Sequence, residues 1–263
     1  MLRVKIPQGI LTTQQLLALA EVGERYSRGF GHISTRQNVQ FHFVKLHDAE
    51  LAMRRLAEEG LTTREAMWQL GPQHHGLSLR WRRRRRGIRH HPYAEAMTRY
   101  LLRHPLSSTL PRKFKIAFEG CPNDHVSTPI NDLGFRVVLG PGGGRGFHVT
   151  AGGGTAILVR SGAVIHEFIP ASELFRVAEA ILRVFQRLGD YKHKQRNRMK
   201  FMIKELGWTR WREEYDRELS RCRLTGAVPT LEIEPPASEA KPDWPLETAP
   251  EIGDIAARVT SHV

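Results

Sequence analysis

The stretch MLRVKIPQGILTTQQLLALAEV, residues 1–22, contains the pattern that decides the fold of the N-terminal region. Apolar and charged residues alternate over residues 1–6, which predicts a strand. Thr12 and Thr13 then offer an N-cap for an amphipathic helix with apolar residues at helical spacing. Those apolar residues are Leu16, Leu17, Leu19, Ala20 and Val22. A strand that leads into a helix over so short a stretch is typical of an α+β fold.

A second strand and a second helix follow. Apolar side chains alternate with polar ones in Ile33–Val44, which predicts a strand, and Asp48–Glu59 has a helical pattern that Gly60 ends. The order strand, helix, strand, helix predicts a ferredoxin-like half-domain over residues 1–66.

The rest of the chain predicts an α+β domain over residues 92–225 and a Pro/Ala/Glu-rich linker over residues 226–263. The expected strands are Lys113–Phe118, Phe135–Leu139, Phe147–Thr150, Ala156–Val159 and Ala163–Phe168. The expected helices are Tyr93–Arg103, a helix capped by Ser172 and ended by Gly189, Lys194–Leu206 and Thr209–Arg223. Because the linker leads only to a short amphipathic piece, we expect that the chain once continued.

Composition narrows the class of protein. Of the 263 residues, 40% are apolar and 25% are charged, the balance of an ordinary globular protein. No run of about 18 apolar residues occurs and the N-terminus lacks a secretion signal, so we expect a cytoplasmic protein without a membrane partner. The two cysteines, Cys121 and Cys222, exclude a disulfide framework and a self-contained four-cysteine metal site.

The net charge of +13 is concentrated in one segment. Residues 67–91 hold seven arginines and no acidic residue, and these arginines supply more than half of the net charge. We expect a basic, disordered segment over residues 67–91. The alternative function from a different class is a non-catalytic nucleic-acid-binding module that uses Arg80–Arg89, although we consider nucleic acid the weaker partner.

Three local motifs have simple interpretations. The glycines of Gly140–Gly146 predict a hairpin turn between two strands, since no Gly-Lys-Ser/Thr follows them. Gly152–Gly154 is either a turn or backbone pressed against a flat ligand. Cys121 and His125 have the spacing of a metal-ligand pair, but a loop with one buried thiol is the expected structure.

Two polar clusters suggest an anion site. Alternation along the strand places Lys113 and Lys115 on one face and Phe114 on the other, and paired lysines repel unless an anion lies between them. The same argument groups five donors on one face of the second strand, which suits a polycarboxylate ligand or a solvated strand face. These donors are Ser34, Arg36, Asn38, Gln40 and His42.

At these clusters the sequence resembles the siroheme-dependent nitrite and sulfite reductases. Residues 1–9 (MLRVKIPQG) are similar to the family's opening strand, and residues 35–42 (TRQNVQFH) are similar to its siroheme-cradling segment. Residues 110–115 (LPRKFK) resemble its substrate-lysine strand, and Gly152–Gly154 and the basic start of a helix at residues 192–200 also fit. The resemblance covers residues 1–66 and 92–225.

The resemblance implies a six-electron reduction of sulfite to sulfide, or of nitrite to ammonia, at siroheme coupled to a 4Fe–4S cluster. Ferredoxin or a flavoprotein would supply the electrons. The implied catalytic cations are Arg3, Lys113 and Lys115, and Lys115 favours sulfite over nitrite. The implied siroheme contacts are Arg36, Gln40, His42, Arg112, Gly152, Gly153, Gly154, Arg198 and Lys200.

The chain departs from the family in its cysteines. The family's cluster ligands belong to its second half, and Cys121 lies in an echo of one ligand motif with His125 in place of the last cysteine. The resemblance therefore implies a cluster whose ligands this chain lacks, and a protein that is the first half of a reductase. We expect the chain alone to be inactive, and a separately encoded second half is a candidate partner.

The second departure is the basic segment, which we interpret as translated out of frame. Met67-Trp68-Gln69 is encoded only by ATGTGGCA and a purine, and reading one base later gives Cys-Gly followed by Asn or Ser. Permitted codons continue this reading to Pro92 as a string that resembles the family and has an arginine where Pro72 stands. A stop codon in the shifted frame would contradict this interpretation.

Overall fold

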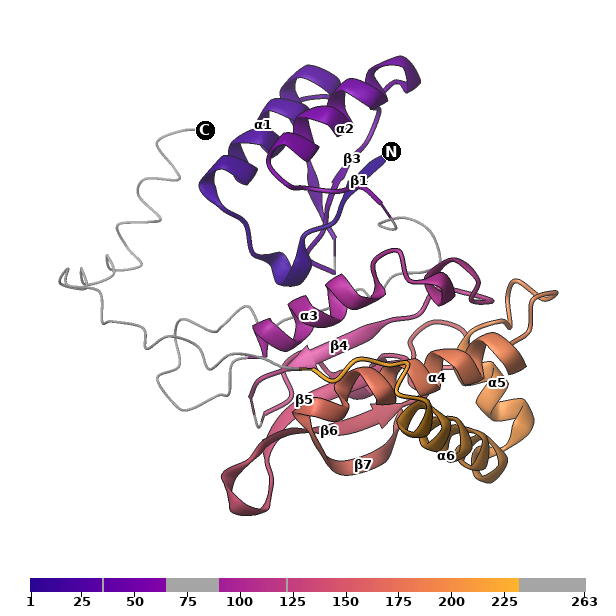
Figure 1. Ribbon diagram of the computed structural model, residues 1–263. Coiled ribbons are helices and arrows are strands. Elements are labelled where there is room, and N and C mark those ends of the chain that lie inside the picture. The colour runs from indigo at the N-terminus through magenta and orange to yellow at the C-terminus, as the bar shows by residue number, and fades with distance from the viewer. Residues whose placement is uncertain (35, 65–89, 122, 232–263) are drawn as a thin grey trace, which may run out of the picture. The chain divides into compact units, whose positions relative to one another are not determined.

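The computed structural model describes residues 1–34, 36–64, 90–121 and 123–231 (Figure 1). In the half-domain the elements are β1 (Leu2–Val4), α1 (Thr13–Tyr26), β2 (His32–Ile33), β3 (Val39–Phe41) and α2 (Ala49–Glu58). The three strands form an antiparallel sheet in the order β1-β3-β2. The predicted order strand, helix, strand, helix is confirmed except that two short strands, β2 and β3, take the place of the second strand.

The half-domain has its own hydrophobic core between the sheet and its two helices. It consists of Val4, Ile6, Leu19, Val22, Phe41, Ala52, Leu56 and Leu61. The predicted N-cap is also present, because Thr12 Oγ1 accepts the N–H of Gln15 at 3.2 Å and Gln15 Oε1 accepts the N–H of Thr12 at 3.1 Å. Gly60 ends the second helical segment with φ +70°, a left-handed conformation that favours glycine.

The long strand predicted over Ile33–Val44 is wrong. The chain turns at residues 34–38, where the N–H of Ser34 donates to the carbonyl of Asn38 at 2.8 Å and Gln37 has φ +60°. Asn38 Oδ1 instead accepts the N–H of Ile6 at 2.9 Å. The turn interrupts the alternation, so the five donors do not share one strand face.

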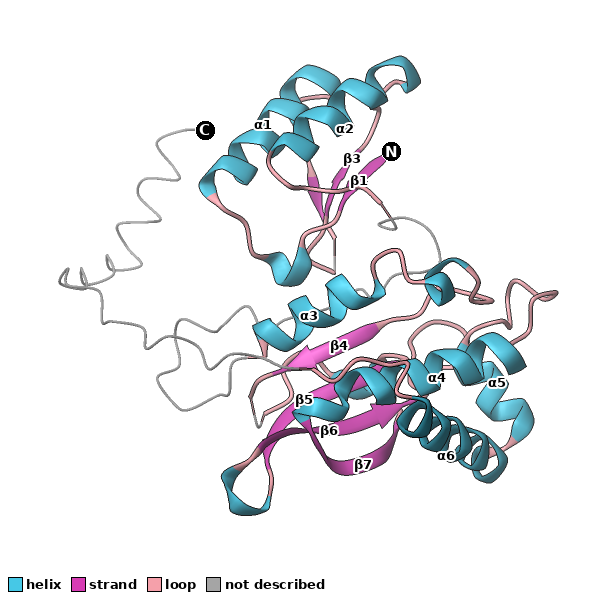
Figure 2. Ribbon diagram, in the orientation of Figure 1, coloured by secondary structure: helices cyan, strands magenta, loops and turns pink. Residues whose placement is uncertain are grey.

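The second region is a mixed α+β domain. Its elements are α3 (His91–Leu101), β4 (Ile116–Glu119), β5 (Leu133–Leu139), β6 (Arg145–Ala151), β7 (Ala163–Pro170), α4 (Leu174–Leu188), α5 (Met199–Leu206) and α6 (Trp208–Thr225). The sheet order is β4-β5-β6-β7, with β4 parallel to β5 and the other pairs antiparallel. One core joins the sheet to all four helices, which Figure 2 shows as separate layers of helix and strand. The predicted α+β class is confirmed.

Four predictions in this domain are wrong: one strand, one helix cap and the first residues of two elements. Ala156–Val159 is not a strand, because Ala156 and Leu158 have positive φ values of 69° and 59°. The first strand, β4, begins at Ile116 rather than at Lys113. Ser172 does not cap α4, since a short 3-10 turn precedes that helix. α5 begins at Met199 rather than at Lys194, because residues 192–197 form a loop.

Other predictions have different outcomes. The glycine-rich hairpin at residues 140–146 is confirmed, with a turn at Pro141–Gly143 between antiparallel β5 and β6. Predictions for residues 67–89 and for most of the linker after residue 231 lie outside the described residues. Within the described part of the chain, no helix has the length and apolar character needed to cross a membrane.

Candidate anion and cofactor site

Lys113 and Lys115 lie on the extended segment that leads into β4. Phe114 between them is buried in the core, whereas Lys113 is exposed and Lys115 is half-buried, so the predicted alternation is confirmed. The N–H of Lys115 donates to Asp132 Oδ2 at 2.9 Å, and the N–H of Leu133 donates to the carbonyl of Lys115 at 3.0 Å. The backbone of Lys115 is therefore fixed at the start of the parallel pair β4–β5.

Asp132 is the residue that connects the predicted site segments. Its side chain is fully buried, and Oδ2 accepts Arg198 Nη2 at 2.6 Å in addition to the amide of Lys115. Its carbonyl accepts the N–H of Gly152 at 2.9 Å. Burial raises the pKa of Asp132, and Arg198 and the Lys115 amide oppose that rise. One residue thus holds the lysine segment, the glycine segment and the start of α5 together.

A group of positive side chains surrounds this carboxylate, and we call Arg36, Lys113, Lys115 and Arg198 the cationic cluster. Burial, followed by the charges of Arg36 and Arg198, lowers the pKa of Lys115 to about 8. Burial, followed by Arg3 and Arg198, lowers the pKa of Arg36 to about 10. Desolvation, followed by the charges of Arg36, Arg198 and Arg112, lowers the pKa of Lys113. The cluster is an electropositive site suited to an anion.

Gly152–Gly154 shows a close approach of backbone to backbone. A Cβ at Gly153 would lie 1.8 Å from the carbonyl oxygen of Pro129, so only glycine fits there. At Gly154 the nearest atoms are instead Lys200 Cδ, Lys200 Nζ and Arg198 Nη2, at 3.0, 3.2 and 3.4 Å. At Gly152, φ is +86° and a Cβ would lie 2.7 Å from Ile203 Cδ1, so contacts within the protein account for glycine at both Gly152 and Gly153. At Gly154 the missing side chain leaves space beside two cations.

Arg198 directly precedes α5, Lys200 lies in its first turn, and both are buried. Lys200 is 1% exposed, and its Nζ donates to the carbonyl of Thr155 at 2.8 Å. Arg198 Nε is a buried donor without a hydrogen-bond acceptor among the described residues. Lys200 therefore has a structural contact, whereas Arg198 retains a donor for a ligand or water.

Among the predicted site residues of the half-domain, Arg36 belongs to the cationic cluster, whereas Arg3, Gln40 and His42 lie outside it. Arg3 lies opposite Gln40 in the β1–β3 pair, and Gln40 is buried there. Arg36 lies in the turn after β2 and acts electrostatically on Lys113 and Lys115. The ring of His42 contacts the rings of His32 and Phe43 rather than the cationic cluster.

The sequence reasoning missed Asp132. A single acid before a strand has no periodic signal, and its position beside Asn131 is typical of a turn. The available signal was its place directly before the apolar run of β5, where an uncompensated carboxylate would be buried. A buried acid requires a cationic partner, but the sequence does not identify Arg198 as that partner among its many cations.

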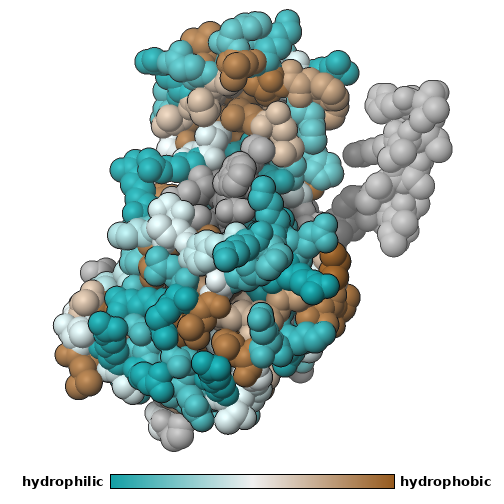
Figure 3. All heavy atoms as spheres, turned by 90° about the vertical axis from the view of Figure 1, so that its right-hand side faces the viewer, coloured by the Kyte–Doolittle hydropathy of each residue, from teal (hydrophilic) through white to brown (hydrophobic). Residues whose placement is uncertain are grey.

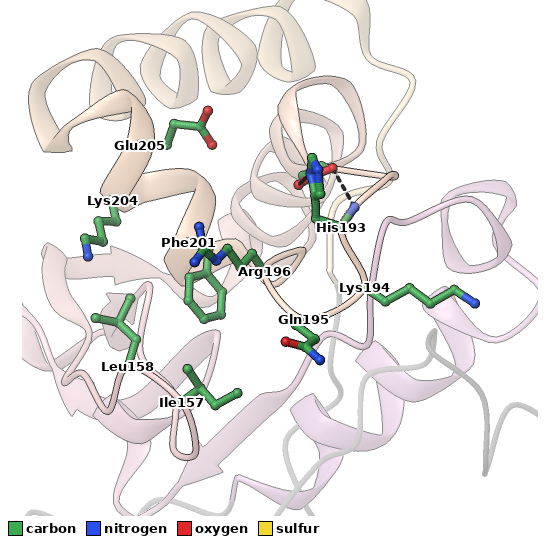
Figure 4. Close-up of a pocket in the computed structure, with 10 residues that line it drawn as sticks. Ile157, Leu158, His193, Lys194, Gln195, Arg196, Phe201, Lys204 and Glu205 are labelled. Atoms are coloured by element: carbon green, nitrogen blue, oxygen red, sulfur yellow. Dashed lines mark hydrogen bonds and ion pairs between the residues drawn. The ribbon is translucent and has the colours of Figure 1, made fainter.

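A separate pocket of about 930 Å³ lies between the loop at Ile157 and Leu158 and the start of α5 (Figure 4). It is lined by Phe201 and by charged side chains of both signs. Asp190 and His193 also line it and are joined by a hydrogen bond of 2.8 Å, drawn as the dashed line at His193 in Figure 4. No member of the cationic cluster lines it. The face of the molecule in Figure 3 shows apolar side chains scattered among hydrophilic ones.

The cysteines do not fit an iron–sulfur cluster. A 4Fe–4S cluster takes four thiolates, and this sequence contains two cysteines. Cys121 lies in a loop whose amides bind the buried carboxylate of Glu119, and Cys222 is buried in the core. In the described ranges, no group of three or more His, Cys, Asp or Glu side chains is placed to hold a metal ion.

Comparison with known proteins identifies the two regions. The family model "Nitrite/Sulfite reductase ferredoxin-like half domain" matches residues 1–59, and "Nitrite and sulphite reductase 4Fe-4S domain" matches residues 85–222. A ferredoxin–nitrite reductase of Leptolyngbya laminosa is 32% identical over 234 residues, which cover 86% of this chain and 46% of the relative. A ferredoxin-type sulfite reductase of Mycobacterium tuberculosis is 30% identical, over 87% of this chain and 41% of that relative.

Solved structures agree with these matches. The Mycobacterium tuberculosis NirA protein has a TM-score of 0.76 and 28% identity, and the match covers 91% of this chain and 42% of NirA. Dissimilatory sulfite reductase I, at 14% identity and a TM-score of 0.66, shares the fold. The chain spans less than half the length of the curated relatives it matches. By its two family domains and its fold, this chain belongs to the nitrite and sulfite reductase family.

Proposed function

We propose that the cationic cluster binds the carboxylates of siroheme and the oxyanion that is reduced, sulfite or nitrite. The observation that carries the proposal is the arrangement around Asp132: Lys115 and Arg198 are fixed to one buried carboxylate, and Arg36 and Lys113 add further positive charge. A macrocycle with eight carboxylates requires several cations. The residues present therefore fit siroheme, and the unused donor of Arg198 and the space at Gly154 support that fit.

Siroheme, when bound, supplies an iron that takes up the electrons of the reaction. Lys113 and Lys115 then hold the oxyanion electrostatically, and Arg3 is their proposed third partner. A lysine with a pKa of about 8 also exchanges protons readily near neutral pH, so Lys115 is suited to donate protons as oxygen is removed. Arg36, Gln40, His42, Arg112 and the Gly152–Gly154 segment stay proposed siroheme contacts, with Arg198 and Lys200.

We further propose that this chain acts with a separate second half and receives electrons from ferredoxin. The names of the relatives support ferredoxin as donor, and their greater length supports additional protein. Residues that ligate the cluster would come from that second half. A cytoplasmic location and a preference for sulfite over nitrite stay predictions of the sequence.

Titration of the purified chain with isolated siroheme tests the site. We expect a shifted Soret band on binding, and Lys115→Gln to weaken binding about tenfold or more, since a charge-assisted hydrogen bond contributes about 1.5–3 kcal/mol. The matched control is Lys204→Gln, an exposed lysine of α5 outside the cluster. Equal weakening in both variants, or no binding by the parent chain, would contradict the proposal.

A second measurement tests the proposed incompleteness. With reduced methyl viologen as electron donor, we expect the siroheme-loaded chain to show no sulfite- or nitrite-dependent oxidation of the dye. Steady turnover by this chain alone would show that no second half is required.

We propose that residues 67–91 are read out of frame in this sequence. The two family models match residues 1–59 and 85–222, so residues 67–84, most of this segment, lie in the unmatched stretch between them, which supports the interpretation for those residues. The nucleotide sequence across codons 60–95 tests it. An uninterrupted shifted frame that encodes Cys-Gly is expected, and a stop codon in that frame would contradict it.

A further inference from the structure

Three aromatic side chains follow one another on the buried face of α6. The ring centroids of Trp208 and Trp211 lie 5.0 Å apart with planes inclined by 28°. Those of Trp211 and Tyr215 lie 5.7 Å apart with planes inclined by 6°. These separations are those of interacting aromatic rings, and helical spacing places the residues on one face. Trp208 is half-buried, whereas Trp211 and Tyr215 are fully buried, so the stack leads from solvent into the core.

The buried end of the stack makes a short hydrogen bond to β7. Tyr215 Oη lies 2.7 Å from His166 Nε2. Within the part of the chain that the structure describes, this hydroxyl has no other hydrogen-bond acceptor. A buried hydroxyl donor left unpaired is unfavourable, so we assign the proton of Tyr215 to this bond, with His166 as acceptor.

The electrostatics of the pair agree with that assignment. Burial, followed by the charge of Arg212, lowers the pKa of His166, which keeps the imidazole neutral near pH 7. Burial also raises the pKa of Tyr215, so this phenol does not ionise on its own near neutral pH. Loss of an electron from Tyr215 must therefore be coupled to transfer of its proton to His166.

The surroundings of Trp211 favour electron transfer through its ring over trapping of a radical on it. Its Nε1 is buried and has no hydrogen-bond partner among the described residues. An oxidised indole becomes a stable neutral radical only by passing this proton to an acceptor. Without an acceptor, oxidised Trp211 stays a radical cation, which is a strong oxidant for the neighbouring tyrosine.

We propose that Tyr215 is a redox-active tyrosine, reached from the surface through Trp208 and Trp211 and coupled to His166 as proton acceptor. An external one-electron oxidant of high potential, such as a ruthenium(III) polypyridyl complex, removes one electron from Trp208. Oxidised Trp208 takes an electron from Trp211, and oxidised Trp211 then takes an electron from Tyr215. The proton of Tyr215 Oη moves to His166 Nε2. The products are a neutral tyrosyl radical, an imidazolium and the reduced oxidant, and both tryptophans are restored.

Flash photolysis of the full chain tests the relay. The ruthenium(III) oxidant is generated by light and a cobalt(III) quencher, and radicals are identified by transient absorption and electron paramagnetic resonance. The experiment uses a Tyr26→Phe/Tyr191→Phe background, because these tyrosines are accessible to the oxidant and Tyr191 is 55% exposed. We expect a tyrosyl radical that forms as a tryptophanyl radical decays.

Two matched variants decide which tyrosine carries the radical. Tyr215→Phe should lose the tyrosyl signal. Tyr100→Phe should retain it, because the ring of Tyr100 stacks on Phe175 and on no tryptophan among the described residues. Tyr100 is a stringent comparison, since its pKa is also raised and its hydroxyl donates a hydrogen bond to Glu179 at 3.2 Å. A tyrosyl signal that persists in Tyr215→Phe, or only tryptophanyl radicals in the background chain, would overturn the proposal.

Two further variants test the relay and the proton acceptor. Trp208→Phe, at the half-buried end of the stack, should lose the tyrosyl signal without the risk to folding of a change at Trp211. His166→Phe should leave a long-lived tryptophanyl radical and no tyrosyl radical. An unchanged tyrosyl yield in Trp208→Phe would overturn the relay, and an unchanged yield in His166→Phe would overturn the coupling to His166.

Discussion

The two regions of the molecule hold their parts of the cationic cluster in different ways. In the larger domain, Arg198 and the backbone of Lys115 are both bonded to the buried carboxylate of Asp132. In the half-domain, Arg36 lies in a turn, and no carboxylate of the described residues is within ion-pair distance of its guanidinium. The comparison shows that one side of the site is fixed before an anion arrives, while the other side has positive charge without a fixed partner.

Because of this difference, substitutions in the two regions should have different effects on folding stability and on anion binding. Removal of a partner from a buried ion pair leaves an uncompensated charge and destabilises the fold. Removal of a cation that has no ion-paired acid relieves an unfavourable charge instead, because burial, followed by repulsion from Arg3 and Arg198, lowers the pKa of Arg36. Substitutions in the larger domain should therefore affect folding first, and substitutions in the half-domain should affect anion binding first.

The largest effect is expected for Asp132→Asn. The charge of Arg198 would stay buried without its carboxylate, which destabilises proteins by about 3–5 kcal/mol. Urea unfolding of the purified chain measures this change. The control is Glu50→Gln, which removes an exposed ion pair with Arg54 within α2 and should change stability little, because solvent screens that pair. If both variants unfold at the same urea concentration, Asp132 does not fix the larger domain's side of the site.

Gly153→Ala should have the next largest effect. The new methyl group would lie 1.8 Å from the carbonyl oxygen of Pro129, so the segment around Asp132 must move. Overpacking of this kind typically costs about 1–3 kcal/mol. Gly144→Ala is the matched control, because no atom lies within 4 Å of a Cβ there and its φ is −61°. Equal unfolding midpoints would show that the glycine segment adapts without loss.

Lys115→Met should stabilise the chain slightly at pH 7. The pKa of Lys115 falls from 10.5 to about 8 on folding, so charged Lys115 opposes folding in full below pH 8. Between pH 8 and 10.5 only the unfolded chain binds this proton, so the stability of the parent rises with pH. Because Lys115 is half-buried and screened, we expect a gain of about 1 kcal/mol at pH 7 that disappears towards pH 10.5.

Urea unfolding at several pH values measures this difference, with Lys194→Met, an exposed loop lysine, as control. A gain that is constant from pH 7 to pH 10.5 would mean that packing, not charge, causes it. Loss of siroheme or oxyanion binding in the same variant would show that this lysine is kept for binding at the expense of stability.

The same comparison explains what the sequence could predict. Lys113 and Lys115 were placed correctly because alternation around the buried Phe114 is a local property of extended chain. The predicted polar strand face around Arg36 is wrong, because Gln37 has a left-handed conformation. Such a conformation usually occurs at glycine, so the sequence carries no signal for it here. Asp132 was missed because its role depends on Arg198, which is distant in sequence. Periodic patterns are visible in a sequence, but single long-range ion pairs are not.

Arg36→Gln is expected to stabilise the chain slightly, by about 1 kcal/mol or less, because no described carboxylate loses an ion pair and because burial and the charges of Arg3 and Arg198 disfavour the charged guanidinium. Its effect on binding should be much larger. Loss of one charge-assisted contact weakens binding of an anionic ligand about tenfold or more. Urea unfolding and siroheme titration of the same preparation measure both quantities.

Arg198→Gln is the informative counterpart, since it should lose stability and binding together. If Arg36→Gln destabilises the chain as strongly as Arg198→Gln does, then the half-domain side of the cluster is also part of the folding scaffold, and the proposed separation between the two regions fails.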